Sequence, residues 1–134
     1  ILSLEGESQA GLLVLSATGP DRLYPPAMRD LYHQVADRAL ILTPLTPGVG
    51  VSEQTLEQRS VVCAYLCPDL LVLQAELPGQ AHTLARLFAD NSRDVYAIPG
   101  SIHSSLYKGS HKLLREGARL TETVADIVQV ATKN

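Results

Sequence analysis

The chain has 134 residues, of which 46% are hydrophobic and 19% are charged, and its formal net charge is −3. This composition is typical of a globular protein, and the length predicts one domain over residues 1–134 that buries a core without metals or disulfides. The mild acidity excludes nucleic-acid binding by net charge, so any such binding has to come from a local patch. The absence of a secretory signal and of a run of about 18 apolar residues predicts a soluble, cytoplasmic protein without membrane contact.

Short apolar runs alternate with amphipathic segments along the chain. The apolar runs at residues 12–15, 40–42, 70–73 and 95–98 predict buried strands. Apolar residues at helical spacing predict helices over residues 25–39 and 53–66, a third helix that ends near Asn91, and a last one that Thr121 or Thr123 caps. Ser52 is placed to cap the second of these helices, and Pro68 is placed to end it.

This alternation of strands and helices is the pattern of βαβ units. It predicts an α/β fold, with a Rossmann-like parallel sheet between two layers of helices. Ligands of such sheets bind beyond the carboxyl ends of the strands. The loops that follow the strands, at residues 16–21, 43–52, 74–79 and 99–110, are therefore expected along one edge.

The segment after the fourth strand concentrates positive charge. Four of the 11 Lys and Arg residues of the chain lie between Ser101 and Arg119, with Glu116 as the only acid. Lys112 and Arg115 share a helix face because they are three residues apart, and Lys108 lies in the loop before them. Such a set binds phosphates without reading bases, although a merely solvated helix face has the same composition.

Further polar residues are candidates for the same site. The turn Pro99-Gly100-Ser101 can offer backbone N–H groups and a hydroxyl to a phosphate, or it can be a plain strand-exit turn. His111 is open to a hydrogen-bonding, phosphate-contacting or structural role. Arg59 is the one basic residue of its helix and either contacts phosphate or pairs with Glu53 or Glu57.

No motif of an enzyme, a metal site or a cofactor site occurs in the sequence. The serine nucleophile elbow, the phosphate-binding lysine loop, the zinc-binding HExxH sequence and the dinucleotide fingerprint are all absent. Cys63 and Cys67 are four residues apart in an apolar run, which predicts two buried residues on a helix face. We therefore expect a binding protein with no catalytic residues, no metal and no cofactor.

Several stretches resemble the DNA-processing protein A (DprA/Smf) family. The resemblance rests on DVYAIPGSIHS at residues 94–104, on Gly109, His111 and Leu114, on REGA at residues 115–118, on DRLYPP at residues 21–26, and on Arg86-Leu87 with Arg93-Asp94-Val95. These stretches follow one another in the family's order from about Leu12 to Val128. Arg59 matches the first Arg of the family's Arg-Asn-Arg helix, whereas Ser60 and Val61 replace its other two residues.

The resemblance implies a function. Members of this family are similar to Rossmann folds, bind single-stranded DNA, and help to load a RecA-type recombinase during DNA uptake and transformation. Carried over to this chain, it makes the Pro99–Ser101 turn part of the strand-edge pocket, makes Lys112 and Arg115 DNA-phosphate contacts, and adds the match of Arg59. Together with the candidates from the residues themselves, the expected DNA- or phosphate-binding residues are Arg59, Gly100, Ser101, Lys108, His111, Lys112 and Arg115. The family's first strand and Gly-Ser-Arg loop would precede Ile1, so we expect a fragment or a divergent member whose sheet lacks its first strands.

Two other functions remain open at this point. A strand-edge pocket in a Rossmann-like protein also suits a small nucleotide, so the chain is alternatively a nucleotide binder or nucleotide hydrolase. The other alternative is a degenerate family member that acts through protein–protein contacts. An open sheet edge of this kind invites pairing, which predicts a homodimer.

Overall fold

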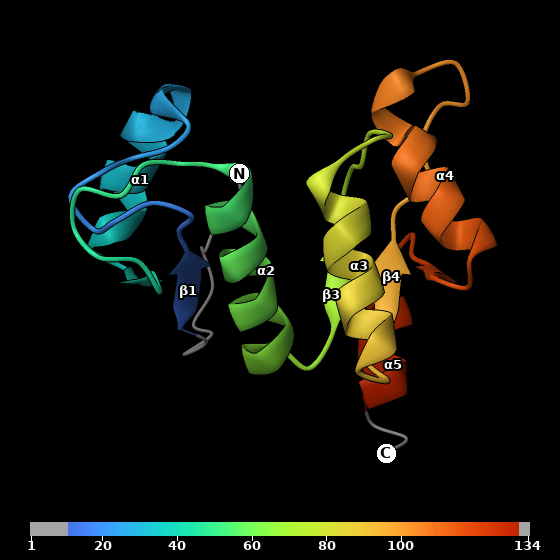
Figure 1. Ribbon diagram of the computed structural model, residues 1–134. Coiled ribbons are helices and arrows are strands. Elements are labelled where there is room, and N and C mark those ends of the chain that lie inside the picture. The colour runs from blue at the N-terminus through green and yellow to red at the C-terminus, as the bar shows by residue number, and fades with distance from the viewer. Residues whose placement is uncertain (1–10, 132–134) are drawn as a thin grey trace. The chain divides into compact units, whose positions relative to one another are not determined.

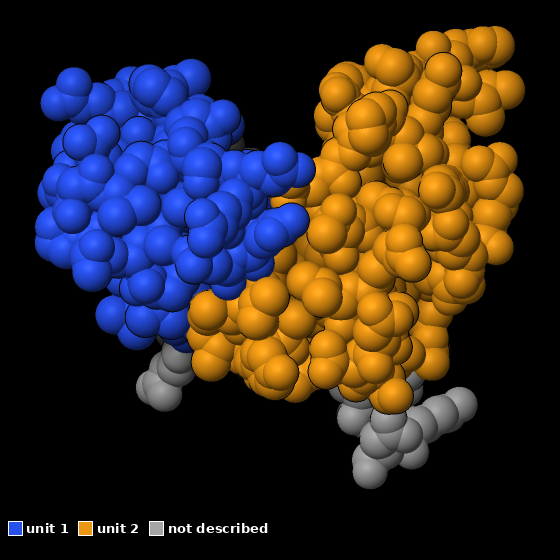
Figure 2. Space-filling model, in the orientation of Figure 1, with its two compact units in different colours: residues 1–59 blue, residues 60–134 orange. Residues whose placement is uncertain are grey.

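The computed structural model describes residues 11–131, with only the backbone for residues 129–131 (Figure 1). Two compact units make up the chain, residues 1–59 and residues 60–134 (Figure 2). All strand pairs among the described residues are parallel, which confirms an α/β fold of parallel sheets flanked by helices. None of the helices in this described part is both long and apolar enough to cross a membrane. A single domain over residues 1–134 stays a prediction.

The first unit contains one βαβ element. Strand β1 (Leu12–Leu15) pairs in parallel with β2 (Ala39–Leu42), and Leu12 lies opposite Ala39. Between them, the 3-10 turn η1 (Pro26–Met28) leads into α1 (Arg29–Ala36). The helix is shorter than predicted at both ends, because residues 26–28 form the 3-10 turn η1 and Ala39 belongs to β2.

Helix α2 (Glu53–Leu66) has the predicted bounds and the predicted cap. The Ser52 hydroxyl accepts from the Thr55 N–H at 3.2 Å, and the Thr55 hydroxyl accepts from the Ser52 N–H at 2.8 Å. This reciprocal pair satisfies two donors at the start of the helix. At the other end, Cys63 and Cys67 are half-buried, with their sulfur atoms 3.9 Å apart and not joined in a disulfide. The prediction of full burial was wrong because the helix ends at Leu66, which leaves Cys67 in the turn.

The second unit contains a three-stranded parallel sheet in the order β3, β4, β5. Its elements, in chain order, are β3 (Leu70–Val72), α3 (Gln80–Asp90), β4 (Val95–Ala97), η2 (Ser105–Tyr107), α4 (Lys108–Arg115), β5 (Arg119–Leu120) and α5 (Ala125–Ala131). Strand β5 was not predicted, since it has only two residues and one of them is charged. The expected single sheet is therefore described as two sheets, one in each unit.

The core of the second unit is made of small residues. Val72, Ala75, Ala85, Ala97 and Leu113 form a buried cluster that joins β3 and β4 to α3 and α4. Phe88 of α3 is also completely buried. Alanines at these positions let both helices come close to the sheet, so α4 is held firmly against the strands that precede it.

The loops after the strands meet within each unit, while the single edge expected for all four loops stays a prediction. In the first unit, the Gly19 N–H donates to the Val49 carbonyl at 2.9 Å, which joins the loops that follow β1 and β2. In the second unit, the Gly109 N–H donates to the Ala75 carbonyl at 2.8 Å, which joins the segments that follow β3 and β4. Each unit therefore has one edge where polar loops gather at the carboxyl ends of parallel strands.

Candidate nucleic-acid interface

Helix α4 separates its buried residues from its basic ones. Gly109, Ser110 and Leu113 are buried, whereas Lys108 and Arg115 are exposed and Lys112 is half-exposed. The three basic residues are spaced i, i+4 and i+7, so they form a single row on the helix surface. We call Lys108, Lys112 and Arg115 the basic stripe. The spacing predicted a shared face for Lys112 and Arg115, which the structure confirms, whereas Lys108, expected in the loop, is the first residue of α4.

The start of α4 is fixed to the end of β3. The N–H groups of Gly109 and Ser110 donate to the Ala75 carbonyl at 2.8 and 3.3 Å. A side chain at Gly109 would place its Cβ only 2.6 Å from the Glu76 carbonyl oxygen and 2.7 Å from that of Ala75. These two amides are thus already bonded to protein and are not available to a ligand.

The turn that precedes α4 is held by His111 and Tyr107. Nε2 of His111 lies 3.0 Å from the Gly100 carbonyl oxygen, to which it donates when it carries the proton. The ring of Tyr107 occupies the space that a side chain at Gly100 would need. These contacts give Gly100 and His111 a structural role, and they place the Tyr107 ring against the turn, where one of its faces is covered.

Ser101 is the polar side chain of this turn that solvent can reach. It is exposed, and its hydroxyl accepts from the His103 N–H at 3.3 Å. A hydroxyl in this state still has a proton to donate, and a phosphate oxygen is a suitable acceptor. Of the two candidates in the turn, Ser101 is therefore better placed than Gly100 to contact a ligand.

Acidic side chains offset part of the positive charge. Lys112 Nζ lies 3.6 Å from Glu116 Oε1, His82 Nε2 lies 2.8 Å from Glu116 Oε2, and Arg119 Nη2 lies 3.1 Å from Asp94 Oδ1. The hydrogen bond from His82, together with Lys112, holds the pKa of Glu116 below its ordinary value. Within the described residues, Lys108 and Arg115 form no ion pair, so their charge is the most available.

Arg59 lies on α2 in the first unit, whereas the other candidate residues belong to the second. It is half-buried and forms no ion pair with any described residue, so the expected alternative of a pair with Glu53 or Glu57 is not formed. A phosphate contact by Arg59 stays a prediction, as do those by the residues of the second unit.

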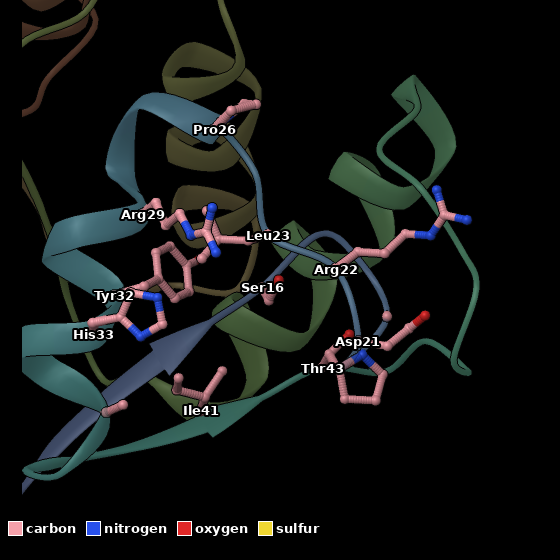
Figure 3. A pocket seen from close by; sticks show the side chains of 13 residues that line it. Ser16, Asp21, Arg22, Leu23, Pro26, Arg29, Tyr32, His33, Ile41 and Thr43 are labelled. Carbon is pink, nitrogen blue, oxygen red and sulfur yellow. The ribbon is translucent and has the colours of Figure 1, made fainter.

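The structure has two hollows that the sequence did not predict. One of about 620 Å³ lies in the first unit beside α1 and is lined by Arg29, Tyr32 and His33 among others (Figure 3). The other, of about 480 Å³, lies between α3, α4 and the starts of β4 and β5. The spacing of Arg29, Tyr32 and His33 at i, i+3 and i+4 was the available signal for the first hollow, but it is also typical of an ordinary amphipathic helix.

A family model described as DNA recombination-mediator protein A matches residues 5–132. The chain belongs to this family. Its sequence is 30% identical over 116 residues to the DNA processing protein DprA of Streptococcus pneumoniae, and 31% identical over 123 residues to a putative DprA of Mycobacterium tuberculosis H37Rv. These alignments cover 87% and 92% of the chain but only 41% and 32% of those proteins, so the chain spans less than half of either relative.

Solved structures of family members share this fold. The X-ray structure of DprA from Streptococcus pneumoniae superimposes with a TM-score of 0.81 at 29% identity, over 90% of this chain and 42% of that one. DprA from Helicobacter pylori, whose structure was described for its single-stranded DNA binding mode, gives a TM-score of 0.78 at 20% identity, over 90% of this chain and 56% of that one. The second likeness supports the fold alone.

Proposed function

We propose that this chain binds the phosphate backbone of single-stranded DNA through the basic stripe, with Ser101 as a neighbouring donor. Membership of the DNA recombination-mediator protein A family supports this proposal. The observation that carries it is the exposure of Lys108 and Arg115, which form no ion pair among the described residues of a chain whose net charge is −3. A local cationic row in an acidic protein directs a polyanion to one surface.

The charge of the stripe sets the expected strength of binding. Neutralisation of Z phosphates on a single strand lowers the logarithm of the binding constant by about 0.7Z for each tenfold rise in salt. If all three residues of the stripe contact phosphates, the slope is about −2. Binding is therefore weak, strongly salt-dependent and tolerant of sequence, because none of these residues is placed to read a base edge.

The test is fluorescence anisotropy with a labelled oligothymidine at salt concentrations from 50 to 200 mM. Arg115→Ala and Lys108→Ala should each reduce the slope by about 0.7, and the double variant by about 1.4. Arg38→Ala is the matched control, since Arg38 is an exposed Arg just beyond α1 and outside the stripe. Equal weakening by Arg38→Ala and Arg115→Ala would mean that net charge, and not the stripe, holds the DNA.

Glu116→Gln tests the stripe in the opposite direction. Glu116 is the acid that faces Lys112, and its neutralisation leaves the Lys112 ammonium available to a phosphate. We expect tighter binding and a slope steeper by up to about 0.7, since one more phosphate contact forms. Unchanged or weaker binding in the Glu116→Gln variant would remove Lys112 from the interface.

The proposed cellular role and protein partners follow from the role of the family. In this view the protein acts in the cytoplasm during DNA uptake and passes the bound strand to a RecA-type recombinase, as a homodimer and without catalysis. Sedimentation velocity of the purified chain, alone and mixed with a RecA-type recombinase and single-stranded DNA, tests both partnerships. A monomer at all concentrations, and no ternary complex, would limit the proposal to DNA binding.

A further inference from the structure

The hollow of the first unit lies where ligands of parallel sheets bind. Ser16 follows β1 directly and Thr43 follows β2 directly, and both line it. Its volume of about 620 Å³ falls within the range of roughly 300–1,000 Å³ that small-molecule sites occupy. The lining residues all precede residue 44, so this pocket is separate from the basic stripe of the second unit.

One wall of the pocket carries cationic and aromatic groups. Arg29, Tyr32 and His33 come from a single face of α1, and their side chains gather beside Leu23 and across from Ile41 (Figure 3). Arg22, from the loop after β1, extends away from these three in the same view. The positive charge that faces this part of the pocket therefore comes from the Arg29 guanidinium, and the His33 imidazole lies one helical turn away.

The acid that lines the pocket is directed elsewhere. Asp21 is the one carboxylate among the lining residues, and its Oδ1 accepts the Gly48 N–H at 2.7 Å. That bond ties the loop after β1 to the loop after β2. Asp21 therefore has a structural partner, and Arg29 and His33 remain available to an anionic group.

Hydroxyl groups gather at the strand ends beside the pocket. Ser16 and Thr43 line it and both bond to Thr18, since the hydroxyl oxygens of Ser16 and Thr18 are 3.0 Å apart and Thr43 Oγ1 donates to the Thr18 carbonyl at 2.7 Å. Leu23, Pro26 and Ile41 add apolar side chains to the lining. A lining that combines polar and apolar groups suits a ligand that joins a flat ring to an anion.

We propose that this pocket binds a single nucleotide unit, with its phosphate on Arg29 and His33 and its base against Tyr32 and the apolar side chains of the lining. A guanidinium fork matches phosphate oxygens, and aromatic faces stack on any base. The unit is either a free nucleoside monophosphate or the 5′-phosphorylated end of a strand, because both present the same groups. The inference does not depend on DNA binding by the basic stripe.

Calorimetric titration with adenosine monophosphate tests the site. We expect saturable binding that Arg29→Ala and Tyr32→Ala each weaken by at least about tenfold, since each removes a direct contact. Tyr32→Phe keeps the ring and should bind within about twofold of the parent chain. Arg38→Ala and Arg115→Ala are the controls, because both residues lie outside the pocket and should leave the affinity unchanged.

Competition identifies the source of the nucleotide. If a 5′-phosphorylated oligothymidine displaces adenosine monophosphate and the same strand with a 5′-hydroxyl does not, the pocket binds a strand end. If neither strand displaces it, the pocket binds the free nucleotide. Inorganic phosphate that binds as tightly as adenosine monophosphate would overturn the role of the ring. No saturable binding at millimolar nucleotide, or full affinity in Arg29→Ala, would overturn the site as a whole.

Discussion

The contact between Gly109 and the end of β3 is where the fold positions the basic stripe, and Gly109→Ala tests it. The new Cβ would lie 2.6 Å from the Glu76 carbonyl oxygen and 2.8 Å from the Ala75 carbonyl carbon. These are backbone atoms, so relief requires a shift of α4 away from β3. That shift would also lengthen the hydrogen bond from the Gly109 N–H to the Ala75 carbonyl, now 2.8 Å.

The magnitude follows from three contributions. Overpacking costs about 1–3 kcal/mol and the lost hydrogen bond about 0.5–1.5 kcal/mol. Alanine regains up to about 1 kcal/mol, because glycine is the poorer residue within a helix. The free energy of unfolding of Gly109→Ala should therefore fall by about 0.5–4.5 kcal/mol, and DNA binding should weaken with it because the stripe moves with α4.

Urea unfolding followed by circular dichroism measures this loss. Gly50→Ala is the matched control, since the nearest atom to its Cβ would be Arg22 Nη1 at 3.9 Å. That variant should stay within about 0.5 kcal/mol of the parent chain. If Gly109→Ala unfolds at the same urea concentration as Gly50→Ala, the close approach of α4 to β3 is not what orients the stripe.

Two further changes test single polar groups of the second unit. Ser110 is completely buried, and its hydroxyl has no hydrogen-bond partner among the described residues. Ser110→Ala should therefore raise the free energy of unfolding, measured in urea, by up to about 1 kcal/mol. If that free energy instead falls by more than about 1 kcal/mol, the hydroxyl has a hydrogen-bond partner. Asp126 accepts from the N–H groups of Glu122 and Thr123 at 3.0 and 2.8 Å, which lowers its pKa below the ordinary value of 3.8. Asp126→Asn should therefore destabilise the chain at pH 7, and its urea midpoint should approach that of the parent as the pH falls below about 3.8 and the parent carboxylate is protonated. A gap of equal size at pH 7 and pH 2.5 would contradict that linkage.

Local sequence determined the elements that were predicted well. The strand at residues 12–15 and the helix at residues 53–66 have the predicted bounds, because an apolar run and a Ser52 cap are both local features of the sequence. The predicted burial of that strand was wrong, since none of its residues is buried and Leu13 is 42% exposed. Strand β5 could not be found in this way. Its two residues, Arg119 and Leu120, pair with Tyr96 and Ala97 of β4. A contact between residues so far apart in the chain cannot be predicted from a local pattern.

The features of the candidate site also divide into those that local sequence predicts and those that depend on contacts between distant residues. The shared face of Lys112 and Arg115 followed from helical spacing alone, whereas Lys108, expected in the loop, joins that face because α4 begins at Lys108 itself. The bond of His111 to Gly100 and the packing of Tyr107 on the turn join residues that are seven to eleven positions apart, across a loop without periodicity. The pair of His82 with Glu116 spans 34 positions. Such contacts depend on how α3 and α4 pack, so they required the structure.

Ion pairs in the second unit reduce the number of basic side chains that are freely available to a phosphate. Of the four basic residues between Ser101 and Arg119, the structure pairs Arg119 with Asp94 and Lys112 with Glu116. Exposed pairs of this kind contribute only about 0–1 kcal/mol, so a phosphate can compete for Lys112, whereas Lys108 and Arg115 have no pair to break. Lys108 and Arg115 can therefore bind a phosphate directly, whereas Lys112 first has to leave Glu116. Binding should depend most on Lys108 and Arg115 and gain most from neutralisation of Glu116, an order that a merely solvated helix face would not produce.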